Sequence, residues 1–333
     1  MNSFWKSILP VAAILFCLIS AAVTGCKANG NDSPSATQPP FISTAASAPP
    51  QAADEPPLPE KSGGFDGKRA FAHVAKQVSF GPRPSGSQAI VQLQDHLQSE
   101  LKGYGCTVGT DAFTADTPVG RLPMKNILIK IPGEKPGVIL LGTHYDTKRL
   151  DNFVGADDGG SSTAVMLELA RLFCKQHGKY AVWIAFFDGE EAVRLQWEDP
   201  DNRYGSRQMA ARFANSGDIK KIRAFLLADL VGGRNSRFRR DDSSTKWLTD
   251  LVWDVAARLG YASLFLNELT GIGGDDHHSF TQRGIPAVDV IDLIPNEVPY
   301  WHTPEDTLDK ISAKTLAIVG HVFLESVKQL QSK

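Results

Sequence analysis

Residues 138–146 read Val-Ile-Leu-Leu-Gly-Thr-His-Tyr-Asp, a short apolar run that follows Pro136 and ends in polar side chains. A run of this length and composition predicts a strand that is buried on both faces. Residues 181–187, which read Ala-Val-Trp-Ile-Ala-Phe-Phe, repeat the pattern. Strands buried on both faces are typical of parallel sheets that are covered by helices. The two runs therefore predict the centre of an α/β domain.

Segments with helical and strand patterns alternate on both sides of these runs. Apolar residues at helical spacing predict helices at residues 65–78, 88–102, 161–176, 204–214, 246–259 and 313–330. Short apolar runs between turn residues predict further strands at residues 106–113, 126–131, 224–227 and 285–291. We see no internal repeat. This order predicts a three-layer α/β/α domain with a mixed, largely parallel central sheet.

The N-terminus has the pattern of a targeting segment. Lys6 precedes an apolar stretch at residues 8–23, as in a secretory signal peptide. The stretch ends in Val23-Thr24-Gly25-Cys26, which resembles a bacterial lipobox. In that resemblance residues 1–25 are removed and Cys26 carries lipid, whereas the alternatives are an ordinary signal peptide or an uncut anchor. Each alternative places the domain outside the cytoplasm, and lipidation would hold it on a bacterial membrane.

The next segment differs in composition from the rest of the chain. Residues 26–64 are dense in Pro, Ala and Ser and have almost no large apolar residues. Such a segment buries too little surface to fold, so we interpret it as an extended tether. Residues 65–333 are then the folded domain.

Charge and cysteine content narrow the class of protein. A formal net charge of −2 offers no basic field for nucleic acid. We interpret the basic cluster at residues 234–240, which two aspartates follow, as a solvated loop. Within the domain only Cys106 and Cys174 remain. They form either one disulfide or two buried thiols, and a cysteine-bound metal is not expected.

Acidic and imidazole side chains follow the predicted strands. Ligands in such sheets bind beyond the carboxyl ends of the strands, so we expect these side chains to lie close together. They are His144, Asp146, Glu190, Glu191, Asp229, Asp275, Asp276 and His302. Converging carboxylates require a counter-charge. Because the set combines histidine with carboxylates and has no cysteine, it suits zinc best, although iron, manganese and cobalt accept similar ligands.

Several motifs resemble those of a known family. The segments at residues 143–146, 155–159, 190–191 and 301–303 resemble the metal-site motifs of the M28 zinc peptidase clan. Within the clan, the glutaminyl cyclases (glutaminyl-peptide cyclotransferases) are the closer match. Their pattern is similar to residues 186–192, Trp197, residues 204–207 and Asp275-Asp276-His277. The resemblance spans roughly residues 71 to 330 and implies a zinc-exopeptidase-like fold.

The resemblance also implies a role for each site residue. One zinc ion would be held by Asp158, Glu191 and His302. Glu190 would be the general acid/base, and Asp229 and Asp275 would share its hydrogen-bonded network. Trp197 and Trp301 would wall the substrate slot, and Asp146 would orient His144. The implied reaction converts the N-terminal Gln of peptides to pyroglutamate with release of ammonia.

Two other functions remain open. In a two-zinc M28 aminopeptidase, His144 and Asp229 would hold a second zinc, Asp158 would bridge both ions, and Glu190 would activate water. A non-catalytic receptor on the same fold would have lost ligands or the base, which this chain keeps.

We expect a monomer that acts on peptide or protein N-termini and contacts the membrane only through lipid. The chain departs from animal cyclases at Thr143 and Ser162, where those enzymes place a pair of cysteines.

Overall fold

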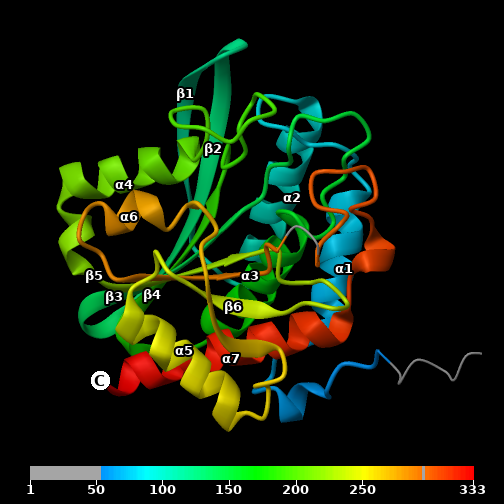
Figure 1. Ribbon diagram of the computed structural model, residues 1–333. Coiled ribbons are helices and arrows are strands. Elements are labelled where there is room, and N and C mark those ends of the chain that lie inside the picture. The colour runs from blue at the N-terminus through cyan, green and yellow to red at the C-terminus, as the bar shows by residue number, and fades with distance from the viewer. Residues whose placement is uncertain (1–53, 295–296) are drawn as a thin grey trace, which may run out of the picture. The chain divides into compact units, whose positions relative to one another are not determined.

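The computed structural model describes residues 54–294 and 297–333 (Figure 1). The predicted signal peptide, Cys26 and the predicted tether up to residue 53 lie outside the described residues. The strands of the central sheet are β1 (Val108–Thr117), β2 (Gly120–Ile131), β3 (Gly133–His144), β4 (Gly178–Phe187), β5 (Ile222–Asp229) and β8 (Ala287–Ile291), in the order β1-β2-β4-β3-β5-β8. The pairs β4–β3, β3–β5 and β5–β8 are parallel, whereas β1–β2 and β2–β4 are antiparallel. The predicted mixed, largely parallel sheet is confirmed.

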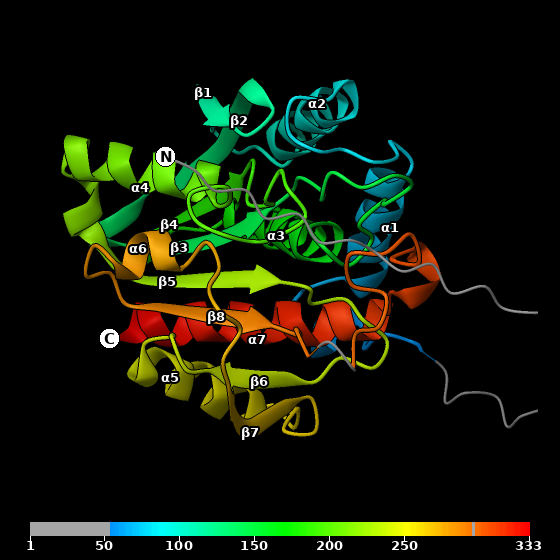
Figure 2. The ribbon, with the colours of Figure 1, turned by 45° about the horizontal axis from the view of Figure 1, so that its top comes forward.

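Helices cover both faces of the sheet (Figure 2). One face carries α1 (Gly67–Val78), α3 (Gly160–Phe173) and α7 (Ala313–Ser332), and the other carries α4 (Tyr204–Ser216) and α6 (His278–Thr281). The remaining helices are α2 (Gln88–Gly103) and α5 (Lys246–Arg258). Successive side chains of a strand point to opposite faces. Ile139 and Leu141 therefore join the core under α3 and α7, while Leu140 joins the core under α4.

The sequence did not predict several short elements. These are β6 (Phe238–Asp241), β7 (Phe265–Thr270) and the 3-10 turns η1 (Pro59–Lys61), η2 (Asp218–Lys221) and η3 (Leu308–Lys310). Strands β6 and β7 form a separate parallel pair. Our interpretation of residues 234–240 as a solvated loop is wrong for residues 238–240, because they belong to β6. There Arg239 pairs with Glu268 and Glu297, and Arg240 pairs with Asp250.

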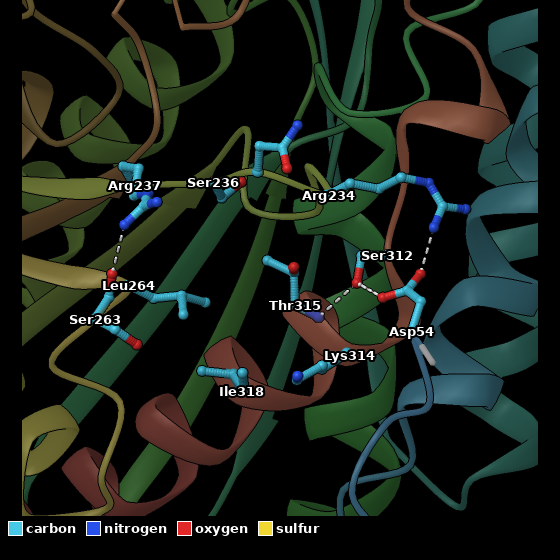
Figure 3. A pocket seen from close by; sticks show the side chains of 11 residues that line it. Asp54, Arg234, Ser236, Arg237, Ser263, Leu264, Ser312, Lys314, Thr315 and Ile318 are labelled. Carbon is cyan, nitrogen blue, oxygen red and sulfur yellow. Dashed lines mark hydrogen bonds and ion pairs between the residues drawn. The ribbon is translucent and has the colours of Figure 1, made fainter. Parts of the chain in front are cut away.

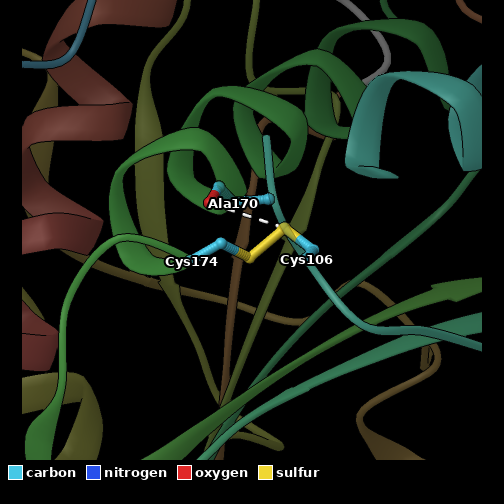
Figure 4. The surroundings of a disulfide bond; sticks show 3 residues. All are labelled: Cys106, Ala170 and Cys174. Atoms are coloured by element: carbon cyan, nitrogen blue, oxygen red, sulfur yellow. Dashed lines mark hydrogen bonds between the residues drawn. A yellow bond between two sulfur atoms is a disulfide. The ribbon is translucent and has the colours of Figure 1, made fainter. Parts of the chain in front are cut away.

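One disulfide, Cys106–Cys174, joins the start of β1 to the end of α3 (Figure 4). The bond closes a sequence separation of 68 residues and lies against the carbonyl of Ala170. Of the two states that the sequence left open for these cysteines, the structure has the disulfide. Among the helices that the structure describes, none combines the length and the hydropathy that a bilayer crossing needs.

Candidate metal centre

The residues expected at the sheet edge do meet there. His144 is the last residue of β3 and Asp229 the last of β5, while Glu190 and Glu191 follow β4. Asp158 precedes α3, and His302 lies in the loop that follows β8. Within the described residues these side chains form two groups of metal-ligand type, in each of which the ligand atoms lie within 4.8 Å of one another. We name them the pocket group (Asp158, Glu191, His302) and the inner group (His144, Asp158, Asp229).

The pocket group is centred on His302. Its Nε2 atom lies 3.1 Å from Glu191 Oε1 and 3.2 Å from Asp158 Oδ2. Burial alone would lower the pKa of His302, but the adjacent carboxylates of Glu191 and Asp158 raise it to about 10. In turn, although burial opposes the effect, the adjacent imidazoles of His144 and His302 hold the pKa of Asp158 below its usual range. The group therefore concentrates negative charge that attracts a cation.

The inner group lies deeper in the protein. His144 Nε2 lies 3.0 Å from Asp229 Oδ1 and 3.3 Å from Asp158 Oδ1. The His144 side chain is 1% exposed and does not line the pocket described below. Asp158 belongs to both groups, so its two oxygens face two different histidines.

Asp146 contacts the backbone of the two residues that follow Gly189 and lies near His144. Its Oδ1 atom accepts a hydrogen bond from the backbone N–H of Glu190 at 3.1 Å and lies 3.6 Å from His144 Nδ1. Its Oδ2 atom accepts a longer bond of 3.4 Å from the N–H of Glu191. One carboxylate therefore positions both Glu190 and Glu191, a member of the pocket group, through their backbone.

Two buried residues that the sequence analysis missed hold the loop of Asp158. The carboxylate of Asp306 accepts the backbone N–H groups of Asp157 and Asp158, at 2.8 and 3.0 Å. Arg83 is fully buried and donates to the carbonyls of Val154 and Gly155. Both contacts join segments far apart in the sequence, so no local pattern announces them.

A cavity of about 240 Å³ opens above the pocket group. Its polar lining includes Asp158, Glu190, Glu191, Asp229, Asp275 and His302, and its apolar lining includes Trp197, Leu230, Ile272, Ile291, Leu293 and Trp301. Trp197 Nε1 donates a hydrogen bond of 3.2 Å to Glu190 Oε1. The Trp301 ring stacks on His302 with a centroid distance of 4.1 Å. The structure thus places both tryptophans at the cavity, where Trp197 contacts Glu190 and Trp301 stacks on His302.

Two residues of this cavity have a strained backbone. Leu230 has φ of +48° and His302 has φ of +52°. Side chains other than glycine avoid this region at a cost of about 1–3 kcal/mol, and such residues cluster at functional sites. The surrounding contacts therefore hold His302 in a conformation that the isolated chain would leave.

The carboxyl groups beside Glu190 favour its protonated form. Burial is the main cause that raises the pKa of Glu190 well above its ordinary value, and the neighbouring Asp275 raises it further. Burial and the Asp289 carboxyl likewise raise the pKa of Asp275. Behind them, His277 Nδ1 lies 3.4 Å from Asp289 Oδ2, and His277 Nε2 lies 3.5 Å from Asp241 Oδ2. Of this buried chain, the sequence analysis named Asp275 and His277 but missed Asp241 and Asp289 as parts of the site.

The side chains of the pocket group fit a metal ion. Asp158 Oδ2 and Glu191 Oε2 are buried and have no hydrogen-bond partner among the described residues. Lys148 Nζ lies 3.5 Å from Glu191 Oε2. Two carboxylates and one imidazole are a donor set that zinc accepts with a fourth position left open.

Thr143 and Ser162 also meet in space. Thr143 Oγ1 donates a hydrogen bond of 2.8 Å to Ser162 Oγ, so the end of β3 is joined to the start of α3. A hydrogen bond therefore stands where the resemblance to animal cyclases would place a disulfide.

Comparisons with known proteins agree with this geometry. The model of peptidase family M28 matches residues 126–327. The glutaminyl-peptide cyclotransferase of Gloydius blomhoffii is 32% identical over 285 residues, covering 73% of this chain and 76% of the relative. The solved glutaminyl cyclase of an Acidobacteriales bacterium is 38% identical with a TM-score of 0.75, covering 86% of this chain and 98% of that one. The Porphyromonas gingivalis glutaminyl cyclase is 31% identical with a TM-score of 0.75, covering 80% and 99%.

Proposed function

The chain belongs to peptidase family M28 and, within it, to the glutaminyl-peptide cyclotransferases, and from this premise we propose that its pocket group holds one zinc ion. The enzyme converts the N-terminal glutamine of peptides to pyroglutamate and releases ammonia. One observation supports a single ion: Asp158, Glu191 and His302 all line the cavity, whereas His144 of the inner group lies buried away from it. An ion in the pocket group would face substrate. A Lewis acid that polarises the γ-carbonyl of glutamine is the chemistry that this ion supplies when bound.

Glu190 is the residue that we assign to proton transfer. In the reaction the α-amino nitrogen bonds to the γ-carbonyl carbon, and the bond from that carbon to the amide nitrogen breaks. The amine gives up one proton and the leaving ammonia takes one, so a single carboxyl that accepts and then returns a proton balances the reaction. Trp197 engages Oε1 of Glu190, and we therefore assign the transfer to Oε2. Asp275, buried beside Glu190, helps to hold the proton there.

The apolar lining of the cavity receives the methylene groups of the glutamine side chain. Trp197 and Trp301 lie on this lining together with Leu230, Ile272 and Leu293. Their surfaces exclude water from the γ-carbonyl, which favours attack by the substrate's own amine over hydrolysis. A volume of about 240 Å³ matches a single residue rather than an extended peptide, so the rest of the substrate lies outside.

The test uses the full chain with Cys26→Ser, purified with zinc, and two peptides that begin with Gln or with Leu. We expect the Gln peptide alone to lose the mass of one ammonia, and a chelator to abolish the change. Release of free N-terminal residues from either peptide would instead identify a two-zinc aminopeptidase. Metal analysis of the same preparation should give one zinc per chain, and two would contradict the pocket-group assignment.

We also propose that the protein is exported and anchored through a lipid on Cys26, and that it acts as a monomer. The lipobox-like segment at residues 23–26 supports the anchor. The Cys106–Cys174 disulfide supports export, because such bonds persist in oxidising compartments. Labelling of cells with a radioactive fatty acid should mark the wild-type chain and leave Cys26→Ser unmarked. Sedimentation of the Cys26→Ser chain should give the mass of one copy.

A further inference from the structure

A second cavity, of about 330 Å³, lies at the N-terminus of α7 (Figure 3). Its lining comes from the loop after β5, the segment before β7, the first turns of α7 and Asp54. Within the described chain it shares no lining residue with the cavity of the metal centre. We name it the α7 cavity.

The Asp54 carboxylate is an anionic group that lines the α7 cavity. The Asp54 carboxylate accepts hydrogen bonds from Ser312 Oγ and, at 2.6 Å, from Arg234 Nη1 (Figure 3). Ser312 is also the N-cap of α7 and accepts the N–H of Thr315 at 3.0 Å. The N-terminus of a helix carries partial positive charge, which favours anions. This face of the domain therefore already binds one carboxylate.

Two further cations of the cavity remain uncompensated. Arg237 donates at 3.1 Å to the backbone carbonyl of Ser263, which is neutral, and Lys314 lies on the first turn of α7. Within residues 54–294 and 297–333, neither side chain forms an ion pair with a carboxylate. Arg239 and Arg240 of the same basic cluster, by contrast, both do. Of the four arginines of the basic cluster, Arg237 is therefore the one without a carboxylate partner among the described residues.

The cavity also contains a buried hydroxyl. Ser236 is 5% exposed, lines the cavity, and its Oγ atom makes no hydrogen bond with the described residues. The nearby Asp292 carboxyl accepts the backbone N–H of Arg237 at 3.0 Å. Burial, above all, raises the pKa of Asp292 to about 7, so this carboxyl carries only part of a negative charge near neutral pH.

We propose that the α7 cavity binds a phosphate group, with Arg237 and Lys314 as its charged contacts. A phosphate carries up to two charges and accepts hydrogen bonds in several directions, which suits cations that come from a loop and from a helix. Guanidinium groups also match phosphate oxygens in geometry. A volume of about 330 Å³ is in the range of small-molecule sites, so the phosphate has room for an attached organic group.

The phosphate can come from a soluble ester or from a lipid headgroup. Asp54 is the first residue that the structure describes, and 27 residues separate it from Cys26 in the sequence. If Cys26 is lipidated as proposed above, the domain stays close to a membrane surface and its lipid headgroups.

Soluble phosphate provides the first test, with the full chain carrying Cys26→Ser. Calorimetry with inorganic phosphate and with glycerol 3-phosphate is run on this chain, on Arg237→Gln/Lys314→Gln, and on Lys102→Gln/Lys220→Gln as a control of equal charge change. We expect the Arg237/Lys314 variant to lose at least about tenfold in affinity and the control to bind normally. Asp54→Asn should bind more tightly, because it removes a competing negative charge. Equal affinity in all variants, or no binding by any of them, would overturn the proposal.

Vesicles distinguish the two sources of phosphate. Flotation with phosphatidylcholine vesicles, with and without phosphatidylglycerol, uses the same three proteins. Binding that needs phosphatidylglycerol and is lost with Arg237 and Lys314 identifies a lipid headgroup. Soluble binding without flotation identifies a free phosphate ester. Unchanged cyclotransferase activity in the variants shows that they fold, because neither residue lines the metal centre.

Discussion

The substitution Asp306→Ala tests whether the loop that carries Asp158 has to be held in place for the protein to bind zinc. The Asp306 carboxylate accepts two backbone N–H groups, those of Asp157 and Asp158, at 2.8 and 3.0 Å. Its removal leaves both donors buried without an acceptor, at about 1–3 kcal/mol for each donor. We therefore expect the free energy of unfolding to fall by about 2–6 kcal/mol. Because Asp158 is a ligand of the pocket group, we also expect zinc affinity to fall by about 10–100-fold.

The assay separates these two effects. Zinc affinity is measured by competition with a fluorescent chelator, and stability by unfolding of the metal-free chain in guanidinium chloride. Asp292→Ala is the matched control. Asp292 also accepts a backbone N–H in the buried interior, that of Arg237 at 3.0 Å, but among the described residues it forms no hydrogen bond with the pocket group. It should lose stability with little change in zinc affinity. If Asp306→Ala binds zinc within about threefold of the wild type, Asp306 does not position the ligand loop and the reasoning fails.

Three further predictions address the acid/base, the disulfide and a buried carboxyl. Glu190→Gln should keep its zinc while turnover falls by about 10²-fold or more, and near-normal turnover would remove Glu190 from the mechanism. Cys106→Ala/Cys174→Ala should lower the free energy of unfolding by up to about 4 kcal/mol, the entropy of a closed loop of this length, and unchanged urea unfolding would contradict this. Burial raises the pKa of Asp292 to about 7. Because this folded-state pKa exceeds the unfolded value, ionisation of Asp292 destabilises the wild type as the pH rises from about 4 to about 7. Asp292→Asn should therefore become more stable relative to the wild type between pH 5 and pH 8, as measured by urea unfolding. An equal difference in stability at both pH values would refute the assignment.

The sequence predicted those parts of the structure that depend on local pattern. The apolar runs at residues 138–142 and 181–187 form β3 and β4, and the polar residues after them lie at one sheet edge. These predictions succeeded because the apolar pattern of a buried strand lies within a few neighbouring residues. The position of the polar residues then follows from the rule that ligands bind beyond the carboxyl ends of parallel strands. Strand β7 was missed because only one of its residues is buried, which leaves no apolar run to detect. Strand β6 was missed because three of its four residues are charged.

The supporting residues of the site could not be predicted in this way. Arg83 donates to the carbonyl of Gly155, which lies 72 positions later in the sequence. Asp306 accepts the N–H of Asp158 and lies 148 positions after it. A lone arginine or aspartate in a loop is usually a surface residue, and only the tertiary path brings these two inside. The state of Cys106 and Cys174 was open for the same reason, since pairing depends on the distance between β1 and α3.

The position of the disulfide bears on the order in which the chain can assemble. The loop that it closes contains β1, β2, β3 and α3, and β4 begins at Gly178, only four positions after Cys174. In the finished sheet β4 lies between β2 and β3. If the disulfide forms before β4 joins the sheet, β2 and β3 have to remain apart so that β4 can insert between them. Otherwise β2 and β3 pair with each other in error. Oxidation after β4 has entered the sheet avoids that trap.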